Sequence, residues 1–318
     1  SKNTIASYRD SFVQFINYMK DINGIPVERL LLKHLTRDNV INYLQWLHNT
    51  KKNTSATCNY RLAAIRSFCS YLQYIVIDNM VEWQSILSIK AKKTEISPPN
   101  YLSMEGIKLL LAQPDTTSWK GRRHLALLSL MYDTGARVQE IADLTVDCVR
   151  IDTTPYTIRL TGKGRKTRIV PLAEAQVDIL RSYMEENNLN DPNMMKKPLF
   201  FNGRHEKLTR EGITYILKIY ADMANKQQPE IIPKKISCHS IRHSKAMHLL
   251  QAGVNLVYIR DILGHVSIQT TDIYARADSK AKREALENAY TRLTPNTITE
   301  KEWERNKNLL EWLKGLGH

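Results

Sequence analysis

Arginine, histidine and tyrosine residues with the types and spacing that phosphodiester chemistry needs recur from the middle of the sequence onward. Cleaving a phosphodiester without a metal requires cations that neutralise the phosphate, a nucleophile, and an acid for the leaving oxygen. Arg137 lies in TGARVQE, a glycine-containing turn that opens a helix, and Glu140 shares its helix face. Arginine suits phosphate because its planar fork donates two hydrogen bonds and stays charged. The spacing predicts that Glu140 orients Arg137; the alternative is an ordinary surface ion pair.

A second group of such residues lies in the string CHSIRHSKAMHLL. His239 and Arg242 are three residues apart, so both can project from one helical turn toward one anion. His239 and His243 are four apart, as two metal ligands on one helix would be. No acidic residue of an HExxH motif lies between them and no third ligand is evident. We therefore expect neither a metal nor another cofactor.

The nucleophile candidate follows in DILGHVSIQTTDIYARAD, where His265 comes after a glycine turn and Tyr274 lies nine residues further on. Tyrosine is a poor nucleophile at its ordinary pKa of about 10, so neighbouring cations must stabilise its phenolate. Taken alone, a tyrosine at such a position is more often a half-buried core residue.

Composition indicates a basic globular protein that binds a polyanion. The 318 residues suffice for two domains with their own cores. Lysine and arginine outnumber aspartate and glutamate by 46 to 32, a formal charge of +14, which favours a nucleic acid as partner. The alternative is a merely basic surface. We find no apolar run of membrane-spanning length and no secretory signal in SKNTIASYRD, so a cytoplasmic location without membrane contact is expected. The four scattered cysteines are expected to be reduced.

The first hundred residues predict a small helical domain followed by a linker. Apolar residues recur at helical spacing over residues 4–20, 37–49 and 55–75. In the third segment Arg61 and Arg66 lie away from the apolar stripe, where they face either DNA phosphates or solvent. The string KAKKTEISPPN then combines Lys92 and Lys93 with two prolines, which disfavour a helix. This basic linker either follows a DNA backbone or is a solvated connector.

The remaining residues predict further helices interrupted by one hairpin. Helical patterns cover residues 104–112 and 124–132 and resume from residues 173, 209, 240 and 254. Strands at 157–160 and 168–170 flank TGKGRKT, whose glycines supply the turn. Residues 300–316 place four large apolar side chains on or near one helical face: Trp303, Leu309, Leu310 and Leu313. This tail is expected to dock either on a neighbouring subunit or on its own domain.

The ordered strings TGARVQE, TGKGRKTR, HSIRH, LGH and TTDIY closely resemble the tyrosine recombinase (phage integrase-like) family, from about residue 103 to 283. The helical beginning, with RLAAIRSF, resembles that family's core-binding domain. The resemblance implies a mainly α, C-shaped DNA clamp: an all-helical core-binding domain over residues 1–92, a linker at 93–100, and a tail helix for subunit docking at 291–318. Between linker and tail, residues 101–290 would form a mixed α+β catalytic domain with a small antiparallel sheet.

The resemblance also implies roles for individual residues. Arg137 and Arg242 would clamp the scissile phosphate, with Glu140 supporting Arg137. His239 would assist deprotonation of the tyrosine or bind the phosphate, and His265 would stabilise the transition state.

Tyr274 would form a 3′-phosphotyrosyl link, and Lys163 would protonate the departing 5′ oxygen. Arg165 and Lys166 lie on the same turn and are rivals for DNA contact. After HSIRH the chain carries Ser244 and Lys245 where the family often has a hydroxyl residue and an aromatic one, which leaves the packing behind that helix open.

The implied function is site-specific recombination of double-stranded DNA by a homotetramer, with an integrase or transposase of a mobile element as our first expectation. A chromosome-dimer-resolving recombinase and a type IB topoisomerase are the enzymatic alternatives. A non-catalytic DNA-binding regulator is the alternative of another class. Covalent attachment of the protein to DNA distinguishes the enzymes from the regulator.

Overall fold

The computed structural model describes residues 2–94, 99–265 and 267–277, and the chain divides into two compact units, residues 1–97 and 98–318. The predicted tail helix, with Trp303, Leu309, Leu310 and Leu313, lies outside the described residues. No helix in the described ranges is long and apolar enough to cross a membrane.

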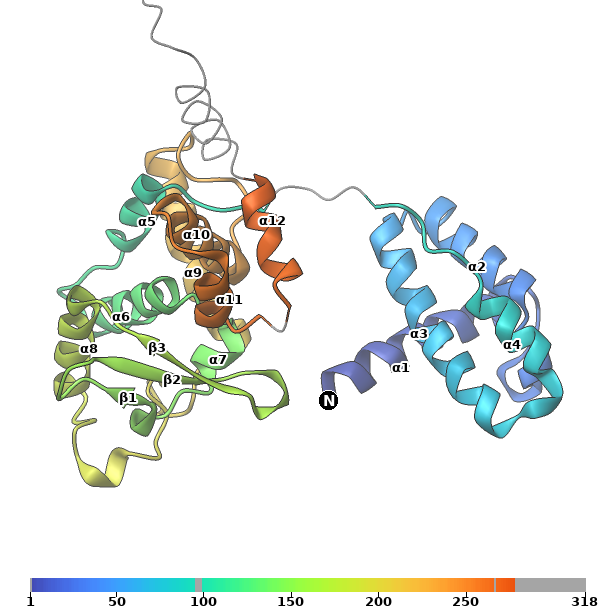
Figure 1. The fold of residues 1–318 in the computed structure, drawn as a ribbon, viewed down its shortest axis with the longest axis horizontal. Helices are drawn as coiled ribbons and strands as arrows, with labels where there is room; N and C mark the ends of the chain where they lie inside the picture. Colours follow the sequence, from blue (N-terminus) through green and yellow to red (C-terminus); the bar gives the residue numbers. More distant parts are fainter. Residues whose placement is uncertain (1, 95–98, 266, 278–318) are drawn as a thin grey trace, which may run out of the picture. The chain divides into compact units, whose positions relative to one another are not determined.

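The N-terminal unit is all-helical (Figure 1). Its helices are α1 (Lys2–Asp21), α2 (Arg37–Asn49), α3 (Ser55–Ile75) and α4 (Met80–Leu87). Thr36 and Thr54 begin α2 and α3, and each hydroxyl accepts a hydrogen bond from a first-turn backbone N–H. The sequence predicted α2 and α3 with these ends from their apolar stripes, and the structure adds the threonine caps. The short helix α4 was not predicted.

Aromatic side chains form much of the core of this unit. Phe15 of α1 meets Tyr43 of α2 edge to face, with ring centroids 5.1 Å apart. Trp83 of α4 is fully buried, and its indole N–H donates to the carbonyl of Val76 at 3.1 Å. Burial of Trp83 therefore holds α4 against α3.

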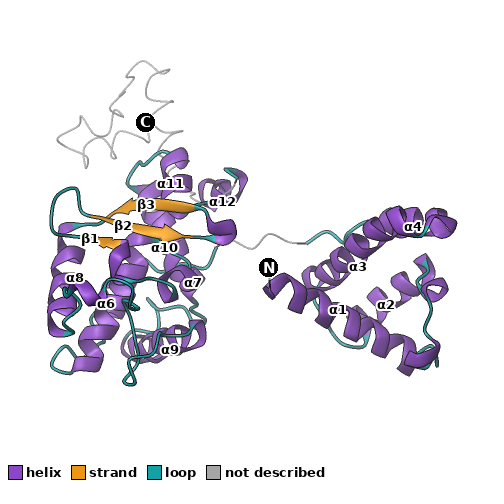
Figure 2. Ribbon diagram, turned by 90° about the horizontal axis from the view of Figure 1, so that it is seen from below, coloured by secondary structure: helices purple, strands orange, loops and turns teal. Residues whose placement is uncertain are grey.

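The second unit combines helices with a small antiparallel sheet (Figures 1 and 2). Its helices are α5 (Met104–Leu111), α6 (Trp119–Thr134), α7 (Val138–Ala142), α8 (Glu174–Glu186), α9 (Arg210–Gln227), α10 (Cys238–Gln251), α11 (Leu256–Leu263) and α12 (Gln269–Ala277). The strands β1 (Val149–Arg150), β2 (Thr157–Thr161) and β3 (Thr167–Pro171) follow one another in the sheet. This confirms the predicted hairpin, to which the structure adds the two-residue strand β1.

Alternation along the sheet explains which face is buried. Ile158 and Leu160 of β2 are fully buried, and Arg159 between them is exposed and pairs in register with Ile169 of β3. The buried face joins a core that α6 crosses. Helix α6 packs against α8 and α10, and α11 against β3, so the end of α11 lies beside the sheet (Figure 1).

Candidate active site

Arg137 and Glu140 lie where the chain passes from α6 into α7. Gly135 ends α6 with a left-handed φ of +56°, which favours glycine, and Arg137 is the first residue before α7. Glu140 accepts from both the backbone N–H and the Nη1 of Arg137, each at 2.8 Å. The side chain of Glu140 is only 3% exposed. The predicted pair is therefore a buried contact that orients Arg137, and not a surface ion pair.

Arg168 of β3 provides the second cation on Glu140, although the sequence did not single it out. Its Nη1 and Nη2 donate to the two carboxylate oxygens at 3.0 and 2.7 Å. Burial raises the pKa of Glu140, but the hydrogen bonds from Arg168 and Arg137 outweigh burial and hold the pKa below its usual range. Glu140 is thus a charged carboxylate between two guanidinium groups.

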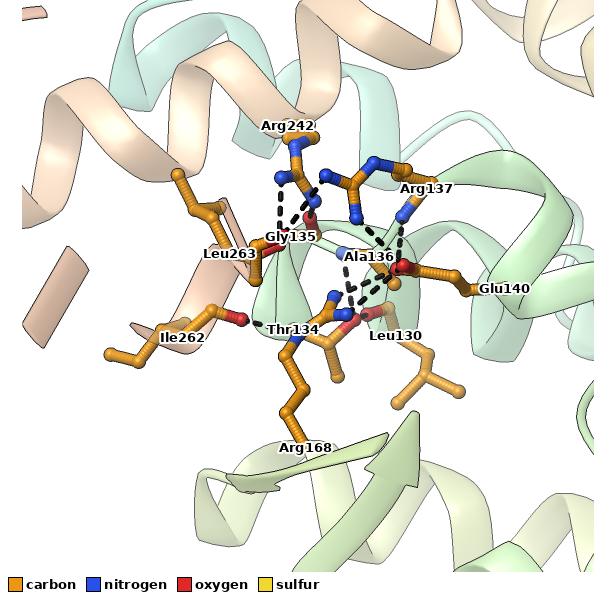
Figure 3. Close-up of polar contacts among 11 residues, drawn as sticks. Leu130, Thr134, Gly135, Ala136, Arg137, Glu140, Arg168, Arg242, Ile262 and Leu263 are labelled. Atoms are coloured by element: carbon orange, nitrogen blue, oxygen red, sulfur yellow. Dashed lines mark hydrogen bonds and ion pairs between the residues drawn. The ribbon is translucent and has the colours of Figure 1, made fainter. Parts of the chain in front are cut away.

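Arg242 lies in the second turn of α10 and is buried. Its Nη1 donates to the carbonyl of Gly135 and its Nη2 to that of Leu263, both at 2.7 Å. Burial, followed by repulsion from Arg137, lowers its pKa to about 10, so it still carries its charge near neutral pH. We call Arg137, Arg168 and Arg242 the arginine cluster (Figure 3).

Tyr274 of α12 is 1% exposed, and its hydroxyl is 2.8 Å from Nδ1 of His243. Burial, followed by the charges of His239 and Arg242, lowers the pKa of His243 to about 4, so its ring is neutral near neutral pH, and it accepts from the Tyr274 hydroxyl in the tautomer that carries the proton on Nε2. Burial raises the pKa of Tyr274, against the opposing effect of Arg242 and Arg137. The resting tyrosine is therefore a protonated phenol. The sequence offered His243 only as half of a metal pair.

The two histidines that the sequence did predict for the site, His239 and His265, also lie near the arginines. His265 follows Gly264, stacks on the ring of Tyr274 at an interplanar angle of 14°, and bonds Thr271 through Nδ1 at 2.9 Å. Burial lowers its pKa to about 4, and Arg242 and Arg137 contribute. His239, in the first turn of α10, has a pKa lowered by partial burial and by the same two arginines. Its ring centroid is 6.1 Å from that of His243.

The hairpin turn, residues 162–166, joins β2 to β3 next to the arginine cluster. The backbone N–H of Gly162 donates to the carbonyl of Lys166 at 2.8 Å, and Gly164 and Arg165 adopt positive φ angles of 75° and 58°. Of Lys163 the structure describes only the backbone. A pocket of about 640 Å³ lies between this turn and the Gly264–His265 turn, and Arg137 and Arg168 also line it. Its lining is mainly cationic, which suits a phosphate group.

Two family descriptions match this chain. The Phage integrase family matches residues 100–281, and the Phage integrase N-terminal SAM-like domain matches residues 1–74. The chain belongs to the phage integrase, or tyrosine recombinase, family. Its members are site-specific DNA recombinases, so the protein is a tyrosine-type DNA recombinase.

Relatives of this recombinase carry both integrase and Xer names. The y4rC protein of Sinorhizobium fredii, which has an integrase/recombinase name, is 32% identical over 99% of this chain and 92% of its own. Tyrosine recombinase XerD of Listeria monocytogenes is 31% identical over 86% of this chain and 88% of its own. Tyrosine recombinase XerC of Herpetosiphon aurantiacus is 32% identical over 90% and 91%.

Solved structures similar to the recombinase contain DNA. The XerH recombinase in a post-cleavage complex with palindromic difH DNA has a TM-score of 0.71 and 25% identity, covering 89% of this chain and 79% of that one. The Tn1549 transposon integrase with transposon right end DNA has a TM-score of 0.69 over 91% and 94%, and at 16% identity it shows the shared fold alone.

The basic residues predicted to contact DNA in the N-terminal unit of the recombinase differ in their surroundings. Arg61 is not a free cation, because its Nη1 donates to the buried hydroxyl of Ser11 at 2.9 Å. Arg66 is half-buried. Lys92 and Lys93 expose their side chains, and the backbone of Lys92 is bonded in both directions to the side chain of Asn59 at 2.8 and 2.9 Å. Arg61 is thus the least available of these candidates.

The departures at Ser244 and Lys245 are accommodated by specific contacts. The buried Ser244 hydroxyl accepts from the backbone of Leu102 at 2.9 Å. Lys245 pairs with Asp133 at 3.2 Å and lies over the ring of Tyr132. These contacts answer the packing question that the sequence left open. Among the described side chains, no group of three or more histidine, cysteine or acidic residues is arranged to hold a metal ion.

Proposed function

We propose that this recombinase cuts and rejoins duplex DNA through a 3′-phosphotyrosyl bond at Tyr274, as the integrase or transposase of a mobile element. One observation carries the cleavage proposal. Residues far apart in the sequence meet in one site. There Tyr274 is hydrogen-bonded to His243 and stacks on His265, and the charges of Arg242 and Arg137 lower its pKa against the effect of burial.

Arg137 and Arg242 are proposed to bind the non-bridging oxygens of the scissile phosphate. Each guanidinium has five N–H donors, and the carbonyl and carboxylate bonds described above use only some of them. Fixed donors of this kind stabilise the charge that builds up in the transition state without reorganising during the reaction.

Cleavage then proceeds by in-line displacement. A bond forms between the Tyr274 oxygen and phosphorus, and the bond from phosphorus to the 5′ oxygen breaks. The phenol proton passes to His243, whose Nδ1 lies 2.8 Å from the hydroxyl, in its Nε2-protonated tautomer, and His239 contacts the phosphate. Lys163 donates a proton to the 5′ oxygen. The phosphotyrosyl link conserves the bond energy, so a 5′ hydroxyl of the same or another duplex reverses the step without ATP.

Contacts outside the cleavage site are proposed for both units. Arg66, Lys92 and Lys93 would follow the DNA backbone on one side, and Arg165 and Lys166 on the other, with a smaller part for Arg61. These roles fit a core-binding domain over residues 1–92, a linker at 93–100 and a catalytic domain over residues 101–290, which together clamp the DNA.

Tetramer assembly on paired sites is proposed to use the tail at residues 291–318. Exchange of four strands needs four active sites, and cyclic docking of tails couples neighbouring subunits. Deleting residues 299–318 should leave binding to a single site intact and weaken the synaptic complex in native gels. Tetramers of undiminished stability after this deletion would rule out the tail as the subunit link.

The integrase part of this proposal is supported by the integrase/recombinase name of y4rC. The XerC and XerD relatives are named tyrosine recombinases, and chromosome-dimer resolution is the alternative role. A cytoplasmic location is proposed for either role. The purified protein is incubated with a pool of genomic DNA fragments, and the sites of covalent attachment are mapped by sequencing. Attachment at the two ends of an inserted element supports the first role. Attachment at one chromosomal locus supports the second, and scattered attachment supports a topoisomerase.

A further inference from the structure

We propose that Arg168 is a positioning residue for strand cleavage, which holds Glu140 and the end of α11 in the one arrangement that aims the arginines and His265 at the phosphate. This inference rests on the cleavage function proposed above and adds a residue to it.

Arg168 is bonded through all three nitrogens of its guanidinium group. Nη1 and Nη2 bind the carboxylate of Glu140 side by side, and Nε donates to the carbonyl of Ile262 at 2.8 Å (Figure 3). The side chain is only 12% exposed, although it projects from a short strand beside the pocket. A paired guanidinium in this geometry has little freedom to turn toward DNA. Its action on the phosphate is therefore indirect.

The end of α11 receives one hydrogen bond from each member of the arginine cluster. The donors and acceptors are Arg168 to Ile262, Arg242 to Leu263, and Arg137 to Gly264, at 2.8, 2.7 and 3.1 Å. These three consecutive carbonyls lie at the negative end of the helix dipole, where they have no acceptor role within the helix. The helix end thus fixes the spacing of three like charges. Arg168 and Arg137 are each bonded to both the helix end and Glu140, and Arg168 is the one whose side chain binds both carboxylate oxygens.

Sharing of Glu140 between two arginines decides how Arg137 is presented. Each carboxylate oxygen accepts one bond from Arg168, so Arg137 has a single side-chain bond to Glu140 and directs Nη2 to Gly264. Without Arg168, a buried carboxylate with free lone pairs would draw Arg137 into a two-bond pair. That rotation would remove Arg137 from Gly264 and from the phosphate position.

Arg168 also lies at the junction of the two turns that line the pocket. It is the second residue of β3, just after the hairpin turn. A Cβ added to Gly264 would lie 2.8 Å from Nη1 of Arg168, and one added to Gly162 would lie 2.9 Å from the Glu140 carboxylate. Both turns approach the Arg168–Glu140 pair so closely that a side chain at either glycine would displace the pair. The Arg168–Glu140 ion pair therefore sets the distance between the hairpin turn and His265.

The test compares Arg168→Met, Arg168→Lys, Glu140→Gln and the double variant Arg168→Met/Glu140→Gln in the full chain. Covalent complex formation on a nicked suicide DNA is measured in single turnover at saturating DNA, alongside DNA affinity and thermal unfolding. Arg159→Met is the control, because it removes an exposed arginine–carboxylate pair from the neighbouring strand. Tyr274→Phe is run in parallel.

Arg168→Met should slow cleavage by about 100-fold, the scale of a small misplacement of catalytic groups, with DNA affinity and the Arg159→Met control near wild type. The cleavage rate of Arg168→Lys should lie between those of Arg168→Met and the wild-type protein. The double variant removes both buried charges, so its thermal stability should be higher than that of Arg168→Met. Its cleavage of DNA should nevertheless remain slow. Wild-type cleavage by Arg168→Met, or by the double variant once its stability returns, would overturn the proposal. If Tyr274→Phe still attached to DNA, the proposed nucleophile would fail instead, while the effect of Arg168 on rate would still be readable.

Discussion

The arginine cluster, through Arg137 and Arg168, and the hairpin turn line the same pocket, but their side chains are held in opposite ways. The cluster is buried or half-buried, and its guanidinium groups are bonded to Glu140 and to carbonyls at two helix ends. The turn is exposed, contains two residues of positive φ, and the described side chains of Arg165 and Lys166 make no hydrogen bond or ion pair. Groups that stabilise charge act best when fixed in advance, whereas a proton donor must follow the oxygen that leaves. The contrast agrees with the roles proposed above, in which the cluster supplies fixed electrostatics and the turn delivers the proton.

The largest effect on cleavage is expected at the proposed nucleophile, the buried Tyr274. Tyr274→Phe removes only the phenolic oxygen and its bond to His243, so DNA binding should persist while covalent complexes disappear. Denaturing gels of protein incubated with suicide DNA measure the complexes, and gel shifts measure binding. Covalent complexes at the normal level in this variant would show that the nucleophile is another residue.

A large effect is also expected at Arg242, and its comparison with the turn tests the contrast directly. Arg242→Ala removes a buried charge with two fixed bonds and should slow cleavage by about 100- to 1,000-fold, the scale for losing one preorganised donor. Arg165→Ala on the exposed turn should change the rate by no more than a few-fold. Single-turnover rates at saturating DNA give both values. Equal losses of cleavage rate in Arg242→Ala and Arg165→Ala would contradict the distinction between the fixed cluster and the exposed turn.

Proton delivery from the turn is tested at Lys163. Lys163→Ala should slow cleavage by about 100-fold, as expected for a lost general acid, and a 5′-phosphorothiolate substrate should restore the rate because sulfur leaves without a proton. Lys166→Ala, which removes an exposed lysine from the same turn, is the matched control. If the sulfur substrate rescued Lys166→Ala instead, the donor would be Lys166.

The smallest expected effect is on the free energy of unfolding, and it comes from the buried histidines and not from the exposed turn. His243 and His265 have pKa values of about 4 in the folded protein against 6.5 for a free side chain, so the unfolded chain binds more protons between these values. The free energy of unfolding should therefore fall as the pH drops from 6.5 toward 4. Urea titrations across this range measure it. His265→Gln should flatten the dependence and Lys166→Met should not. An unchanged slope in His265→Gln would contradict the burial effect.

Sequence reasoning recovered the parts of this molecule that local patterns specify. Helices α2 and α3 were predicted with their observed ends from apolar residues at helical spacing, and the structure adds the threonine caps that begin them. The strand–turn–strand around residues 162–166 was predicted because glycines separate two runs of β-forming residues. Arg137 and Glu140 were paired correctly because they are three positions apart at the start of α7, where their side chains lie on one face.

Contacts between distant elements escaped prediction. Arg168 meets Glu140 across 28 residues of sequence, and no local pattern distinguishes it from other arginines of a basic protein. His243 was considered only for its spacing from His239, while its partner Tyr274 lies 31 residues away on α12. Arg61 appeared free because its helix stripe says nothing of Ser11 on α1, which accepts its hydrogen bond. Tertiary packing decided each of these.

The three carbonyls at the end of α11 have a consequence for when the enzyme becomes able to cut DNA. Gly264 is 127 residues from Arg137 along the chain, and Ile262 is 94 from Arg168. A nascent or partly folded chain lacking α11 would hold two or three guanidinium groups close together with too few acceptors, so the groups would repel one another and turn toward water. The contacts at the end of α11 join segments 94 and 127 residues apart, so they exist only when the unit is folded. The arrangement of the three arginines is therefore a property of the complete fold and not of the segments that carry them.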